Sequence, residues 1–211
     1  EVPSVGRSTS MTELAELVLE SGERRVPVVE DGELLGIVTV TDIVRAIAEG
    51  EQDGDTTVDA LATREVNTVY HATPLPVAER EISYANVPYA VVLDDDGRQT
   101  GIVTEVDIIE VARVVQGESN PGDAVANQDD EWMWEGIKAV GSRSIPTLNV
   151  EIPSTAVSEF MTEDLVTVSK TRSARDAAQL MLSNDIEQIP LLSGDELIGI
   201  VRDIDLLEAL V

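Results

Sequence analysis

The chain has 211 residues, of which 41 are acidic and 14 basic, so its formal net charge is -27. Because 43% of its residues are hydrophobic, this charge belongs on the surface of a folded protein. The composition excludes the basic patches that nucleic acids and anionic lipid surfaces require. The sequence contains no apolar run near the roughly 20 residues of a membrane span and no visible signal peptide, so we expect a cytoplasmic protein without membrane insertion.

The basic residues are unusual, because only Lys138 and Lys170 are lysines and the rest are arginines. A dense acidic coat with few lysines is typical of proteins from salt-loving organisms. In molar salt the Debye length is about 3 Å, so repulsion within the acidic surface is screened. The sequence therefore predicts a halophilic protein whose fold loosens in low salt.

In chain order, the first helix is predicted over residues 11–20, whose apolar residues recur with helical period. Ser10 and Glu13 have the spacing of a capping box at its start. Two apolar runs follow, and Asp31-Gly32 between them is a strong hairpin signal. A second helix opens at Asp42. The predicted unit is therefore strand, helix, strand, strand, helix.

A seven-residue phrase closes three copies of this unit, and it starts at Gly36, Gly101 and Gly199. Each phrase has glycine, an apolar pair, a polar residue and, six residues after the glycine, an aspartate. Copies at matching offsets indicate a duplicated structural unit. We expect the glycine to serve close backbone packing rather than ligand contact.

The three copies resemble the CBS domain, named after cystathionine β-synthase. The resemblance rests on the leading V-x-E-F-M-T at 157–162, the hairpin with proline followed by apolar residues, and the G-h-h-[T/S]-x-x-D phrase. It implies an α/β (α+β) fold of tandem β-α-β-β-α domains that pair into Bateman modules. The expected divisions are a repeat without its leading segment over 1–50, repeats over 57–114 and 156–211, and a segment over 115–155 that contains an acidic loop, a Trp-containing helix near 130–140 and an extended linker.

The resemblance also implies clefts that bind adenosine-containing ligands. In such proteins the aspartate of the phrase binds the ribose hydroxyls, the Thr or Ser three residues earlier lies near the ribose or phosphate, and backbone before the hairpin proline faces the base. A carboxylate suits a diol because it accepts two hydroxyl hydrogen bonds. The candidate ligand-binding residues are Arg25, Val26, Thr39, Thr41, Asp42, Thr68, Tyr89, Thr104, Asp107, Thr167, Gln188, Ile189, Arg202 and Asp205.

Several of these residues have a second interpretation. An aspartate at a helix start also caps the helix. Arg24 and Arg25 could meet a phosphate or be solvated surface. Tyr89 could stack on a base or pack in the core. Arg202, which replaces the Thr of the phrase, could bind a phosphate or fill its cleft by pairing with Asp203 or Asp205. Outside the repeats, Trp132 and Trp134 could form an interface or a lid, or anchor a long connection.

We expect no catalytic activity, because His71 is the sole histidine, cysteine is absent and no metal-ligand spacing occurs. The sequence predicts a regulatory sensor that binds AMP, ADP, ATP or S-adenosylmethionine, requires no cofactor and forms a homodimer through CBS pairing. The alternative is a scaffold or oligomerisation module with degenerate, empty sites. We expect the sequence to be a fragment of a four-repeat chain, in which repeats two and three pair and repeat one pairs with a fourth repeat upstream. In the alternative arrangement, repeats one and two pair, and repeat three pairs across a dimer.

Overall fold

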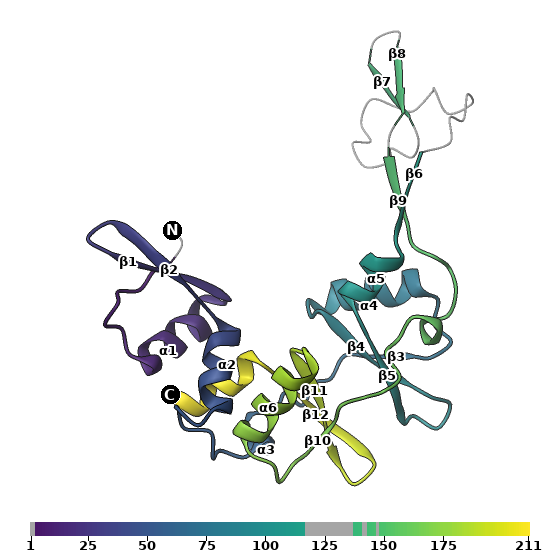
Figure 1. The fold of residues 1–211 in the computed structure, drawn as a ribbon. Helices are drawn as coiled ribbons and strands as arrows, with labels where there is room; N and C mark the ends of the chain where they lie inside the picture. The colour runs from purple at the N-terminus through teal and green to yellow at the C-terminus, as the bar shows by residue number, and fades with distance from the viewer. Residues whose placement is uncertain (1–2, 117–136, 141–142, 147) are drawn as a thin grey trace. The chain divides into compact units, whose positions relative to one another are not determined.

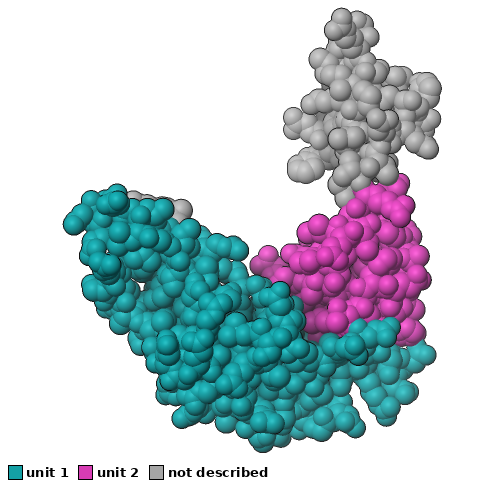
Figure 2. Space-filling view, viewed as in Figure 1, with its two compact units in different colours: residues 1–66, 94–100, 163–211 teal, residues 67–93, 101–162 magenta. Residues whose placement is uncertain are grey.

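A computed structural model describes residues 3–116, 137–140, 143–146 and 148–211 (Figure 1). The predicted acidic loop and both tryptophans lie outside these residues. The chain divides into two compact units (Figure 2). Unit 1 contains residues 1–66, 94–100 and 163–211, and unit 2 contains residues 67–93 and 101–162. Among the described residues, no helix combines the length and apolar character needed to cross a membrane.

Repeat one lies in unit 1 and has the predicted order of elements. A parallel bridge from Val5 to Val28 precedes the helix α1 (Met11–Ser21), the hairpin of β1 (Arg25–Glu30) and β2 (Glu33–Thr39), and the helix α2 (Val40–Ala48). The capping box of Ser10 and Glu13 is formed. Asp31 and Gly32 have φ angles of 52° and 83°, the left-handed conformation that a two-residue hairpin turn of this kind requires.

Repeat three also lies in unit 1 and repeats this architecture. Its elements are β10 (Val168–Ser169), α6 (Ala174–Asn184), β11 (Gln188–Ser193), β12 (Glu196–Arg202) and the 3₁₀ helix η2 (Ile204–Leu210). The hairpins match in register, because Pro27 faces Ile37 across one and Pro190 faces Ile200 across the other.

Repeats one and three share one hydrophobic core. Helix α2 packs against α6, and α1 packs against η2. The buried residues at this junction include Val18, Ile43 and Ile47 from repeat one, and Met181 and Leu206 from repeat three. Neither pairing considered from the sequence combines these two repeats in one core.

Repeat two lies in unit 2 from residue 67 onward, apart from residues 94–100, which contain the hairpin turn and the start of β5. Its elements are β3 (Thr68–Tyr70), α4 (Leu75–Ala85), β4 (Tyr89–Leu93), β5 (Gln99–Thr104) and α5 (Glu105–Val111), with strand order β3-β4-β5. Its core includes Val69, Leu75, Ile82, Val103 and Ile108.

Two further strand pairs follow α5. Strand β6 (Arg113–Gln116) pairs with β9 (Leu148–Glu151), and β7 (Ile137–Val140) pairs with β8 (Arg143–Pro146). The predicted helix near 130–140 is therefore wrong at residues 137–140, the part of it that the structure describes. The two end residues, Ile137 and Val140, are β-branched, and pairing with β8 supplies main-chain hydrogen bonds that favour the extended form.

Repeats two and three exchange their leading segments. The segment before repeat two contains the short helix α3 (Val58–Leu61) and bridges to β12 of repeat three through Thr63 and Ile200. The segment before repeat three contains the 3₁₀ helix η1 (Val157–Glu159) and bridges to β5 of repeat two through Thr162 and Ile102.

The phrase glycines allow these segments to approach. A Cβ built on Gly199 would lie 2.9 Å from the Thr63 carbonyl oxygen, and one on Gly101 would lie 3.0 Å from the Thr162 oxygen. The expectation of close backbone packing is confirmed at these two glycines. It is not met at Gly36, where a Cβ would have no neighbour within 4 Å among the described residues.

Candidate functional site

One backbone hydrogen bond recurs in all three repeats and joins the two parts of each candidate site. The residue directly after the second hairpin strand donates its N–H to the carbonyl that precedes the first hairpin strand. The phrase and the approach to the hairpin therefore lie side by side in each repeat. These bonds run from Val40 to Arg24 (3.1 Å), from Glu105 to Pro88 (3.1 Å) and from Asp203 to Glu187 (2.8 Å).

In repeat one, Asp42 caps helix α2. Its Oδ2 accepts hydrogen bonds from the backbone N–H of Thr39 (2.9 Å) and from the Thr39 hydroxyl (2.8 Å). Its Oδ1 accepts one from Arg45 at 3.2 Å. These bonds, led by that of the Thr39 hydroxyl, lower the pKa of Asp42, although partial burial opposes them. Both carboxylate oxygens of Asp42 are therefore engaged.

In repeat two, Asp107 caps helix α5 and retains a free oxygen. Its Oδ2 accepts hydrogen bonds from the Thr104 backbone N–H and hydroxyl, both at 2.8 Å. Its Oδ1 accepts no hydrogen bond from any residue that the structure describes. The carboxylate is half-buried, so capping leaves one of its oxygens able to accept a hydroxyl of a ligand.

In repeat three, Arg202 closes the equivalent position. Asp205 is 3% exposed. Its Oδ2 accepts the Arg202 backbone N–H at 2.8 Å, and the guanidinium Nη2 reaches its Oδ1 at 2.6 Å. The guanidinium Nε lies 3.1 Å from both oxygens. Of the alternatives considered from the sequence, the structure has Arg202 paired with Asp205.

Asp203 is also occupied, by an arginine of repeat one. Both terminal nitrogens of Arg24 donate to the two Asp203 oxygens, and Arg24 lies 3.2 Å from Glu187. The hydrogen bonds to Asp203 raise the pKa of the Arg24 guanidinium, against the effect of burial. Arg24 thus holds repeats one and three together within unit 1, whereas its neighbour Arg25 is exposed.

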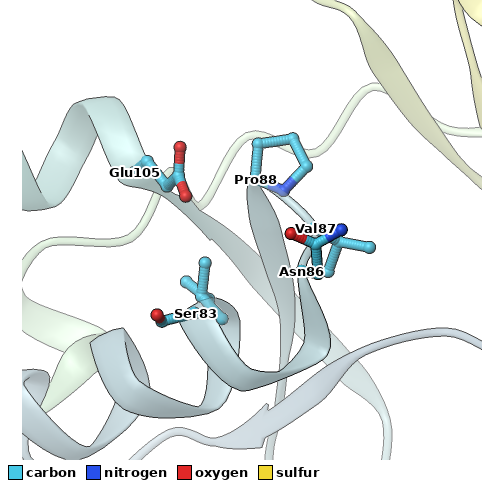
Figure 3. Close-up of a pocket in the computed structure, with 6 residues that line it drawn as sticks. Ser83, Asn86, Val87, Pro88 and Glu105 are labelled. Atoms are coloured by element: carbon cyan, nitrogen blue, oxygen red, sulfur yellow. The ribbon is translucent and has the colours of Figure 1, made fainter. Parts of the chain in front are cut away.

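Unit 2 contains a pocket of about 320 Å³ at the approach to the hairpin of repeat two (Figure 3). It lies between the end of α4 and the first residue of α5. Its polar side chains come from Ser83, Asn86 and Glu105. Thr104 and Asp107 do not line it, although they flank Glu105 in the chain. The remaining lining residues are Ile82, Val87 and Pro88.

Sequence reasoning did not select Ser83, Asn86 or Glu105 as site residues. Asn86 has a φ of 53° and caps the end of α4 in the left-handed conformation, which asparagine adopts more readily than most residues. An asparagine just before Val87-Pro88 was the available signal that a helix ends at this pocket.

The remaining candidate residues divide by burial. Val26, Tyr89 and Ile189 are buried, so Tyr89 packs in the interior as one of its two interpretations requires. Thr41 and Thr68 are exposed, and Thr167 and Gln188 are half-buried near the starts of β10 and β11. No group of metal-ligating side chains gathers among the described residues.

The model of the CBS domain family matches residues 1–49, 58–113 and 157–211. An uncharacterised protein of Methanocaldococcus jannaschii is 30% identical over 90% of this chain, which spans 41% of that protein. An L-aspartate semialdehyde sulfurtransferase of the same organism is 32% identical over 47% of this chain, but the match covers 19% of the enzyme. The chain thus spans less than half the length of these two curated relatives.

Solved structures share this fold. A crystal structure of an uncharacterised conserved protein from Pyrococcus horikoshii covers 100% of this chain and 80% of its own, with 29% identity and a TM-score of 0.76. The CBSX2 protein in complex with AMP covers 73% of this chain and 95% of its own, with 18% identity and a TM-score of 0.51. The second comparison concerns the fold alone.

Proposed function

This chain belongs to the CBS domain family, and from that premise we propose that it is a regulatory module that binds an adenosine-type ligand, principally at repeat two. The observation that carries the proposal is the free Oδ1 of Asp107 on the first turn of α5. Glu105, on the same first turn, lines the pocket at the hairpin approach. The AMP bound to CBSX2, a protein of the same fold, supports an adenosine compound as the ligand.

The three repeats differ in their capacity to accept a ribose. In repeat two, one carboxylate oxygen of Asp107 accepts no hydrogen bond from the described residues. In repeat one, Arg45 and Thr39 engage both oxygens of Asp42. A ligand at repeat one would have to displace Arg45, whose side chain is 51% exposed. We therefore rank repeat two first and repeat one second as ligand sites.

The geometry of repeat three favours the alternative function, that of a scaffold with a closed site, for this repeat. Arg202 and Arg24 neutralise the two buried aspartates at its helix start, so a ligand would have to break a buried ion pair to enter. We propose that repeat three is a structural repeat that stabilises unit 1. The chain then combines a ligand-binding repeat with a scaffold repeat, and association into a homodimer is part of the same proposal.

Calorimetric titration with AMP, ADP, ATP and S-adenosylmethionine in molar KCl tests the proposal. Asp107→Asn keeps a carbonyl oxygen for the Thr104 N–H but replaces the free acceptor with an amide group. A lost hydrogen bond to a charged group costs about 1.5 to 3 kcal/mol, so affinity should fall by roughly tenfold or more. Asp205→Asn, at the closed repeat, is the matched control and should leave affinity unchanged. Absence of heat with all four ligands would favour the pure scaffold.

A further inference from the structure

The pocket of unit 2 carries a negative charge that no described residue neutralises. Glu105 is the only ionisable residue among the six described residues that line it (Figure 3). Its exposed side chain forms no ion pair or hydrogen bond with the described part of the chain. Asp107 adds a second acid on the same turn of α5. Arg80, the one basic residue of α4, does not line the pocket. The pocket therefore favours a positive charge.

The matching residue of repeat three shows what an acid at this position can bind. Glu105 and Asp203 each follow the second hairpin strand directly, and each donates its N–H to the carbonyl before the first strand, at 3.1 and 2.8 Å. The Asp203 carboxylate binds the guanidinium of Arg24, whose two terminal nitrogens donate to its two oxygens. In repeat one the position is Val40, which is buried and uncharged. An acid at this position is thus placed to bind a cation from outside its own repeat.

The approach to the hairpin makes the contrast between repeats one and two larger. The carbonyl in this bond belongs to Pro88 in repeat two and to Arg24 in repeat one, where the exposed Arg25 follows. Between residues 81 and 112 of repeat two, the only basic residue is Arg98, in the hairpin turn. A phosphate in the pocket would therefore meet the carboxylate of Glu105 without a lining cation, and like charges brought together weaken binding.

We propose that Glu105 determines ligand specificity at repeat two, because it favours an adenosine compound with a positively charged substituent and disfavours one with a phosphate. The inference rests on the proposed function and concerns the same site. The ribose binds Asp107, and the substituent enters the pocket, where Glu105 binds its cation as Asp203 binds a guanidinium. A pocket of about 320 Å³ is small for a ligand site, so it suits one part of the ligand. S-adenosylmethionine, with its sulfonium and ammonium groups, has this chemistry, whereas AMP, ADP and ATP do not.

The test is calorimetric titration of the whole chain in molar KCl with adenosine, AMP, S-adenosylmethionine and S-adenosylhomocysteine. Adenosine carries neither charge, so its binding reports on the proposed function alone. S-adenosylhomocysteine differs from S-adenosylmethionine by one methyl group and one positive charge. We expect S-adenosylmethionine to bind about fivefold or more tightly than S-adenosylhomocysteine, as for an ion pair that solvent partly screens. AMP should bind more weakly than adenosine, because its phosphate is repelled.

A change of one side chain then identifies the residue responsible. Glu105→Gln removes the charge and nearly keeps the shape, so it should reduce the ratio of affinities for S-adenosylmethionine and AMP by about tenfold. The ratio is compared because a general loss of affinity cancels in it. Glu110→Gln is the matched control, since Glu110 is exposed on the same helix, does not line the pocket and carries the same charge. It should leave the ratio unchanged.

The outcomes separate this inference from the proposed function. If adenosine binds but AMP binds more tightly than S-adenosylmethionine, charge selection is wrong and the proposed function stands. The same holds if Glu105→Gln leaves the ratio unchanged, or if Glu110→Gln reduces it as much, since the selection would then not come from Glu105. If adenosine does not bind, the proposed function is refuted and the inference is refuted with it.

Discussion

Replacing Arg202 with alanine should destabilise unit 1, because it leaves a buried carboxylate without its cation. Asp205 would lose three hydrogen bonds from the guanidinium and keep the one from the backbone N–H. Removing one partner of a buried ion pair costs about 3 to 5 kcal/mol. The Arg202 side chain is 37% exposed, so solvent screens the pair and we expect about 2 to 3 kcal/mol. In a chain of this size, that lowers Tm by roughly 4 to 12 °C.

Thermal and denaturant melts followed by circular dichroism measure this loss. Arg202→Thr restores the hydroxyl cap that Thr39 and Thr104 provide, and it should recover about 1 kcal/mol of the loss. Arg45→Ala is the matched control, because its pair with Asp42 has the same spacing but is exposed, and its cost should stay below about 1 kcal/mol. Equal losses for Arg202→Ala and Arg45→Ala would refute the reasoning, since burial would then contribute nothing.

Three other predictions concern stability. Gly199→Ala should cost about 1 to 3 kcal/mol, because its Cβ meets the Thr63 backbone, whereas Gly36→Ala should be neutral or stabilising; chemical denaturation of both variants compares them. The pKa of Asp42 is lowered in the folded state, so its contribution to stability is present above the ordinary value of 3.8 and is lost as the pH falls through the lowered pKa. Asp42→Asn should therefore lose less stability than the unaltered chain over that acid range, and parallel titration curves would contradict this. The net charge of -27 predicts that Tm rises from dilute buffer to molar KCl, and an unchanged melt would show that the acidic surface is not an adaptation to salt.

The repeated unit could be predicted because its signals are local. Asp31-Gly32 selects a hairpin turn, and Ser10 with Glu13 caps a helix, whatever surrounds them. The phrase glycines were correctly assigned to packing at Gly101 and Gly199, because a glycine within a strand is typical of a place where another backbone approaches closely.

The combination of repeats could not be predicted in the same way. Val18 lies on the apolar stripe of α1 and Ile47 on that of α2. These stripes have the same sequence pattern whichever repeat buries them, so the sequence does not distinguish Met181 of repeat three from another partner. The sequence likewise left three possible partners for Arg202, which were Asp203, Asp205 and the phosphate of a ligand. That choice depends on burial, because the buried charge of Asp205 is unfavourable unless an arginine neutralises it.

The pocket residues were missed for a related reason. Ser83 and Asn86 lie at the end of a helix, outside the phrase that carries the family pattern, and they meet Glu105 only through the fold. The strand at 137–140 was missed because four residues with one lysine fit a helix and a strand equally well until β8 pairs with them.

The central claim, that the free oxygen of Asp107 binds the ribose of an adenosine ligand, is tested most directly by a thermodynamic cycle. The ligand that binds most tightly and its 2′-deoxy analogue are titrated into the unaltered chain and into Asp107→Asn. We predict that the deoxy analogue binds the unaltered chain about tenfold or more weakly, as expected for one hydrogen bond to a carboxylate, and that Asp107→Asn no longer distinguishes the two ligands. Discrimination that remains in Asp107→Asn would contradict the account.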